Sequence, residues 1–215
     1  MVLHTKTQES LARSGWHRPQ VNILVLGAER VGKSALVIRF LTRRFIGEYS
    51  HIETIYTHNV TVDGEETRFH VWDSLNPQGR GVMAHPSEQQ MRWADGFVLV
   101  YSILDRRSFE AARRQLAWLH REAGGARAPV VLVANKTDLC HQRVVSVEEG
   151  RLLALGSGCA FLEVSAAESY HEVALAFRQL MATVQGSKAV PRRAAGLRGI
   201  IRSVSAVFGG KRRVD

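Results

Sequence analysis

The feature that most constrains this chain is a glycine-rich run at residues 27–34, which reads GAERVGKS. The run fits the pattern G-x-x-x-x-G-K-[ST], which forms a loop between a strand and a helix. Residues 21–26 before it are apolar and β-branched, and a helical pattern extends from Lys33 to about Arg43. Backbone N–H groups of such a loop surround a phosphate chain. The sequence therefore predicts a phosphate-binding loop, although a glycine-rich turn beside a capping serine has the same composition.

Two residues of this loop have the side chains that phosphate chemistry requires. An ammonium group at Lys33 reaches the β- and γ-phosphates, and a hydroxyl at Ser34 ligates Mg²⁺. Lys33 is therefore also a candidate catalytic residue. The residues that we expect to contact the phosphates are Gly27, Glu29, Arg30, Val31, Gly32, Lys33, Ser34 and Ala35.

The rest of the chain alternates between strand and helix patterns. Apolar runs at residues 97–101 and 130–134 are typical of strands covered on both faces. Residues 60–62 and 68–72 alternate around an Asp-Gly turn, as an antiparallel hairpin does, and residues 159–164 are a sixth strand candidate. The helices expected after these strands span residues 108–121, 147–155 and 170–184. This order predicts an α/β fold: a six-stranded, mostly parallel sheet with one antiparallel edge strand and helices on both faces.

Two further polar motifs follow strand ends. The run NKTD at residues 135–138 follows one strand, and the run SAA at residues 165–167 follows another. Open α/β sheets bind ligands at the carboxyl ends of their strands. Taken alone, residues 135–138 also fit a polar turn. Their position after a phosphate loop indicates a nucleotide site instead.

With these motifs, residues 20–186 resemble the Ras superfamily of small GTPases, whose base-recognition motifs are N-K-x-D and S-A-K. The resemblance implies a P-loop NTPase fold that binds GTP and GDP with Mg²⁺. It implies that Asp138 accepts two hydrogen bonds from guanine and that Asn135 connects the base site to the phosphate loop. Lys136 would lie along the base plane.

The same resemblance completes the expected base site. The backbone N–H of Ala166 would donate to the guanine carbonyl, between Ser165 and Ala167. Residues 43–49 and 92–101 resemble the branch around the Ras-related and estrogen-regulated growth inhibitor and its like-named relative. In that branch Phe45 would stack on the guanine, whereas the alternative is a core aromatic at a helix end.

The segments that sense the γ-phosphate depart from the family pattern. Asp73 retains the type and position needed to hold Mg²⁺ through water, together with Ser34. The family's D-T-A-G-Q, however, reads DSLNP at residues 73–77. Pro77 replaces the glutamine that orients the attacking water, and proline has no donor. Gln78, one residue further along, is kept as a candidate catalytic residue.

Two other departures concern the first switch and the phosphate loop. Residues 49–56 contain no threonine in register for Mg²⁺, because Thr54 is displaced toward the next strand. Glu29 replaces the usual glycine at the third place of the loop, and its carboxylate would repel the γ-phosphate and obstruct an arginine finger. We therefore expect slow or impaired GTP hydrolysis. A pseudo-GTPase that binds a partner without nucleotide is the alternative.

Charge divides the chain into a neutral domain and basic ends. The net charge is +9, of which +7 lies in residues 188–215. We expect a flexible leader at residues 1–19, the nucleotide-binding domain at 20–186 and a basic tail at 187–215. Apolar residues recur at three- and four-residue spacing within the tail, which is an amphipathic pattern, although a disordered basic tail is equally compatible.

The tail and the cysteines bear on localisation. We expect peripheral contact of residues 188–215 with anionic membranes, and no nucleic-acid partner, although composition alone does not separate these uses from nuclear import. Two cysteines are too few for a disulfide framework. No cysteine stands four residues from the end, so we expect no prenylation. A cytoplasmic protein is the expectation, with effector and regulator proteins that the sequence does not identify.

Overall fold

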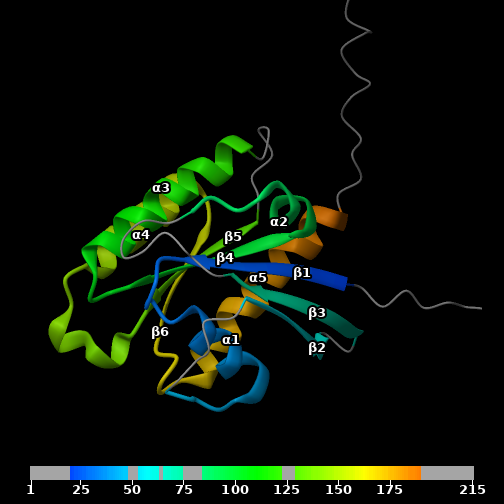
Figure 1. Cartoon of the computed structure of the whole chain (residues 1–215), viewed down its shortest axis with the longest axis horizontal. Coiled ribbons are helices and arrows are strands. Elements are labelled where there is room, and N and C mark those ends of the chain that lie inside the picture. The colour runs from blue at the N-terminus through cyan, green and yellow to red at the C-terminus, as the bar shows by residue number, and fades with distance from the viewer. Residues whose placement is uncertain (1–19, 48–52, 63–64, 75–83, 123–128, 190–215) are drawn as a thin grey trace, which may run out of the picture.

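The computed structural model describes residues 20–47, 53–62, 65–74, 84–122 and 129–189 (Figure 1). These residues form one six-stranded sheet with the order β2-β3-β1-β4-β5-β6. The strands are β1 Gln20–Gly27, β2 Thr54–Val62, β3 Glu65–Asp73, β4 Gly96–Ser102, β5 Val130–Asn135 and β6 Ala160–Val164. Only the β2–β3 pair is antiparallel. The expected mostly parallel α/β fold is therefore confirmed.

Helices cover both faces of the sheet (Figure 1). They are α1 Lys33–Thr42, α2 Glu88–Trp93, α3 Arg106–Glu122, α4 Val147–Ser157 and α5 Tyr170–Ala189, with a 3-10 turn, η1, at Thr137–Gln142. Alternate residues of β1 face two separate cores: Ile23 and Val25 pack with α1 and α5, and Leu24 and Leu26 pack with α3 and α4. Burial on both faces explains why this strand is apolar without alternation.

The strand order reverses at β1, because β3 lies on one side of it and β4 on the other. The phosphate loop follows β1 at this point. β1 lies between β3 and β4 and is parallel to both. The loop leaves β1 at Gly27, directly beside Val100 of β4, and a Cβ on Gly27 would come within 2.4 Å of the Val100 carbonyl oxygen. Such a reversal opens a crevice at the carboxyl ends of the strands, where ligands of doubly wound folds bind.

Several element boundaries differ from those predicted. β2 begins at Thr54 instead of residue 60, and its whole length pairs with β3. Its residues are largely polar because it is an edge strand, so apolar alternation does not mark its start. α2 and η1 were not predicted, because neither buries a residue. The turn at residues 63–64 lies outside the described residues.

Helices α3, α4 and α5 are each longer than expected, whereas α1 matches its expected span. α3 begins at Arg106 and α5 continues to Ala189, beyond the expected domain end at residue 186. Within the described ranges, no helix has both the length and the apolarity needed to span a bilayer.

Candidate nucleotide-binding site

The phosphate loop has the backbone conformation of an anion-binding turn. Gly32 caps α1 with φ 97° and without a side-chain capping bond, and Arg30 also has positive φ, at 61°. This leaves the first N–H groups of α1 for a ligand, where the helix dipole favours negative charge. Gly32 is also a point of close approach, because a Cβ there would lie 2.3 Å from Nδ2 of Asn135.

Lys33 lies over this loop. Its Nζ donates to the carbonyl oxygens of Gly27, at 2.9 Å, and Ala28, at 3.1 Å. Burial lowers the pKa of Lys33, and the carboxylates of Asp73 and Glu29 oppose that shift. The ammonium group is thus held where a phosphate bound to the loop would meet it. The carboxylate of Glu29 therefore acts on the same ammonium group.

Asp73 ends β3 with a buried carboxylate, only 6% exposed. The pKa of Asp73 is raised, mainly by burial and also by the charge of Glu53. A hydrogen bond with Ser34 and the charge of Lys33 oppose this shift. Its Oδ1 has no hydrogen-bond partner among the described residues. A buried, incompletely satisfied carboxylate next to a hydroxyl fits a hard divalent cation such as Mg²⁺. Ser34 and Asp73, both predicted from sequence, are therefore the side chains that would hold the metal.

Asn135 connects the base site to the phosphate loop. Its Nδ2 donates to the Val31 carbonyl oxygen at 2.9 Å, and its Oδ1 accepts from the Ala166 N–H at 3.2 Å. The side chain is 2% exposed. The expected link between the two loops is present. The expected donor to guanine is not free, however, because the N–H of Ala166 is bonded to Asn135.

The other base-site residues lie beside Asn135. Oδ1 of Asp138 accepts from the Ser165 hydroxyl at 2.7 Å, and Ser165 also accepts from the Glu168 N–H at 3.1 Å. Lys136 has a left-handed backbone, with φ 73°, at the start of η1. Burial lowers the pKa of Lys136, and the charges of Asp138 and Asp105 oppose this shift. The carboxylate that is expected to read guanine therefore has a fixed orientation.

The structure describes three more of the predicted site residues but not Gln78. Ala35 is buried in α1, and Ala167 is half-buried after β6. Phe45 follows α1 and is 45% exposed, which contradicts its alternative as a core aromatic. Gln78, with residues 75–77, lies outside the described residues.

Glu53 is a site residue that sequence reasoning missed. Its Oε1 accepts from Nε1 of Trp72 at 2.6 Å and from Nε2 of Gln90 at 2.9 Å. The adjacent Thr54 lies in β2, opposite Asp73, so its displacement toward the strand is confirmed. Extending the predicted hairpin pairing back to Thr54 would have placed Glu53 next to the end of β3.

The comparisons with known proteins agree with this geometry. The model of the Ras family matches residues 22–186. The Ras-related and estrogen-regulated growth inhibitor-like protein of Bos taurus is 38% identical over 201 residues, covering 90% of this chain and 98% of that protein. The Ras-like protein family member 11B of Mus musculus is 44% identical over 167 residues, covering 76% of this chain and 68% of that protein.

The chain belongs to the Ras family of small GTPases. The resemblance to this superfamily is therefore confirmed, and so is the similarity to the growth-inhibitor branch. Ras-family GTPases generally bind guanine nucleotides with Mg²⁺ and act in signalling with effector and regulator proteins. The residues of the phosphate loop and of the base site are the part of this chain that such a nucleotide would contact.

Proposed function

We propose that this chain is a guanine-nucleotide-binding signalling protein with slow GTP hydrolysis. The observation that carries the nucleotide part is the bridge through Asn135, which joins Val31 of the phosphate loop to Ala166 of the base site. Through these two hydrogen bonds the buried amide fixes the two loops relative to each other. A guanine nucleotide spans the same two loops.

The proposed binding roles follow from the contacts of each side chain. Lys33 offers a cation to the phosphates, while Ser34 and Asp73 offer oxygen ligands. Mg²⁺ bound there would neutralise charge on the phosphate oxygens. Asp138 offers a carboxylate to the paired N–H donors of guanine, which adenine lacks.

Slow hydrolysis rests on Glu29 and on Pro77. The carboxylate of Glu29 is close enough to Lys33 to oppose the lowering of its pKa by burial, so it competes with the γ-phosphate for the same cation. Negative charge there also opposes the charge that develops on the phosphate during transfer. Pro77 in turn offers no donor to an attacking water.

One observation favours the alternative of a nucleotide-independent module. Glu53 links the start of β2 to Trp72 and Gln90 through protein groups alone. These hydrogen bonds involve no residue of the phosphate loop or of the base site, so a partner that binds this face would contact a surface separate from those loops.

The deciding experiment is to release the ligand from purified protein by heat and to identify it by chromatography. We expect GDP or GTP to be released at close to one molecule per chain. Lys33→Ala should lose it, and Asp138→Asn should shift preference toward xanthine nucleotides. Competition by ATP as strong as that by GTP would contradict guanine specificity, and nucleotide-free protein that stays folded would favour the alternative.

The basic tail supports a second, separate proposal about location: a cytoplasmic protein in peripheral contact with anionic membranes. Residues 188–215 have a net charge of +7, and each basic residue near such a surface contributes about 1 kcal/mol. The test is co-sedimentation with anionic and neutral vesicles, comparing the full chain with one that ends at Ala189 and so keeps α5 whole. Binding should require the tail and fall as salt rises. Equal binding by both chains would make nuclear import the better interpretation.

A further inference from the structure

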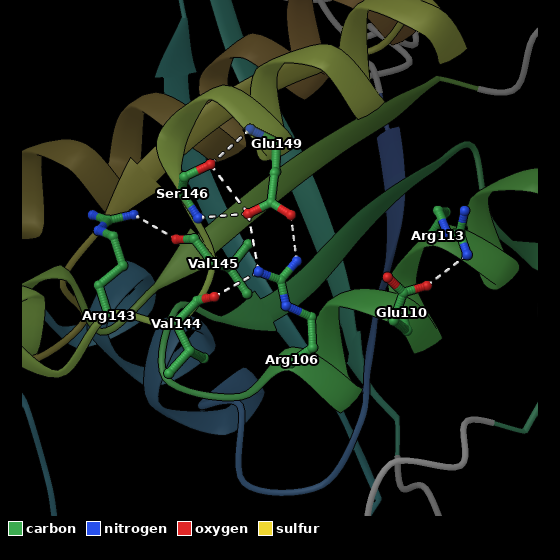
Figure 2. A network of polar contacts seen from close by, with 8 residues as sticks. All are labelled: Arg106, Glu110, Arg113, Arg143, Val144, Val145, Ser146 and Glu149. Carbon is green, nitrogen blue, oxygen red and sulfur yellow. Dashed lines mark hydrogen bonds and ion pairs between the residues drawn. The ribbon is translucent and has the colours of Figure 1, made fainter.

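Arg106, the first residue of α3, makes a set of contacts outside the phosphate loop and residues 135–138 (Figure 2). Its guanidinium donates to both carboxylate oxygens of Glu149, with 3.1 Å from Nη2 to Oε2. The same Nη2 donates to the carbonyl oxygen of Val144 at 2.6 Å. One side chain thus joins α3 to the first turn of α4 and to the segment that precedes α4.

Glu149 in turn fixes the start of α4. Its Oε2 accepts from the backbone N–H of Ser146 at 2.9 Å, and the Ser146 hydroxyl accepts from the Glu149 N–H at 3.2 Å. This reciprocal pair is a capping box. The bond with Arg106, followed by the bond with the Ser146 backbone, lowers the pKa of Glu149 to about 2.

The segment held by Arg106 closes the base loop, by which we mean residues 136–142. The loop starts after Asn135, whose carbonyl oxygen accepts from the Ile103 N–H at 3.1 Å. It ends before Val144 and Val145, whose N–H groups both donate to the Ile103 carbonyl oxygen, at 2.9 and 3.1 Å. Both ends of the base loop are therefore attached to one residue, three positions before Arg106.

A further pair holds the far end of the loop. Arg143 donates to both carboxylate oxygens of Glu163 on β6, at 2.6 and 3.3 Å. Arg106 also holds this end, through the carbonyl oxygen of Val144. The loop carries Lys136 and Asp138, so movement of this end would displace the groups that face the base.

We infer that Arg106 is a positioning residue for guanine recognition, acting through Val144 and Glu149 on the base loop. The inference rests on the proposed function, because it assigns a residue to the same site. Arg106 is 45% exposed and Glu149 39%, so solvent screening limits the effect. The expected consequence is therefore a loss of base selectivity of roughly 1.5- to fivefold rather than a loss of binding.

The test compares the affinities for GDP and for inosine diphosphate, which lacks the 2-amino group that Asp138 would bind. Arg106→Ala and Glu149→Gln should lower the ratio of these affinities and speed GDP release, while Arg106→Lys should have a smaller effect. Arg107→Ala is the matched control, because Arg107 is the next residue of α3, is exposed and carries the same charge. Its ratio should equal that of the wild type.

The outcomes separate the inference from the proposed function. A pair that only joins α3 to α4 would lower thermal stability in Arg106→Ala and Glu149→Gln without changing the ratio, and that result would overturn the inference alone. A wild-type chain that binds no guanine nucleotide would overturn the proposed function, and the inference with it. Should Arg106→Ala not fold, Glu149→Gln and Arg106→Lys give the same comparison.

Discussion

The side-chain amide of Asn135 donates to the carbonyl oxygen of Val31 across 2.9 Å, although the two residues are far apart in the sequence. The same amide accepts from the N–H of Ala166. The ends of β5 and β6 and the phosphate loop are therefore joined by one buried group. Its loss should affect both stability and nucleotide binding.

We expect Asn135→Ala to destabilise the nucleotide-free protein. It would leave the Val31 carbonyl and the Ala166 N–H buried without this partner, at about 1–3 kcal/mol for each unsatisfied group. Urea titration measures the free energy of unfolding, and fluorescence titration measures GDP affinity. Asn135→Asp is the informative companion, because it can accept from Ala166 but cannot donate to Val31. Equal stability of wild type and both variants would contradict the bridging role.

A pair of glycine substitutions should have opposite effects on stability. Gly32→Ala places a methyl group 2.3 Å from Nδ2 of Asn135 at a residue with φ 97°, so it should destabilise by at least about 1–2 kcal/mol. Gly156 lies within α4, and outside its chain neighbours and the adjacent helix backbone nothing lies within 4 Å of an added Cβ. Gly156→Ala should therefore stabilise by about 0.5–1 kcal/mol. Thermal unfolding of both variants checks the two signs, and a stabilising Gly32→Ala would contradict the tight approach to Asn135.

Acid should remove the contribution of Glu149 to stability. Its pKa in the folded protein, about 2, lies below the ordinary value of 4.5, so its contribution is complete above the ordinary value. The contribution is lost as pH falls from there toward about 2. The difference in free energy of unfolding between wild type and Glu149→Gln should thus shrink over this interval. Urea titrations at neutral and acid pH measure it, and a difference independent of pH would show that Glu149 acts through packing alone.

Site residues that belong to a motif with a fixed residue type and spacing were predictable from the sequence. Lys33 could be assigned from the phosphate-loop pattern after a recognisable strand. Asn135 could be assigned from a family motif at a strand end, because a parallel sheet brings such ends to one edge. Asp73 could be assigned for the same reason. The contacts of these residues, by contrast, depend on loop geometry, which is why the N–H of Ala166 was assigned to guanine although it is bonded to Asn135.

Elements without a buried face were not predictable from apolar periodicity. β2 is an edge strand of mainly polar residues, so its first half was missed, and Glu53 with it. α2 buries no residue, but Ser87 and Gln90 form a capping box at its start. That serine and glutamine, three residues apart, are the local signal by which α2 could have been found.

Replacing the carboxylate of Asp73 should separate folding from metal binding. Burial disfavours its charged form, so Asp73→Asn should stabilise the nucleotide-free protein while reducing the dependence of GDP affinity on Mg²⁺. Glu53→Gln removes a like charge near Asp73 and should stabilise in the same direction without losing the Mg²⁺ dependence. Urea titration and GDP release with and without a chelator give the two readouts. A destabilising Asp73→Asn whose GDP affinity still depends fully on Mg²⁺ would refute the assignment of Asp73 to the metal.

Hydrolysis is the final prediction, and it follows from the position of Glu29 beside Lys33. Removing the carboxylate in Glu29→Gly should raise the single-turnover rate of GTP hydrolysis about tenfold, because a like charge near the γ-phosphate is lost. Pro77→Gln should raise it independently by restoring a side chain that can orient water. The double variant should then respond to an activating protein, whose arginine finger contributes about 10³–10⁵ in rate. Glu66→Gln, an exposed carboxylate on β3, is the control and should leave the rate unchanged. A wild-type rate that neither Glu29→Gly nor Pro77→Gln increases would refute the proposal that these two residues are what slows hydrolysis.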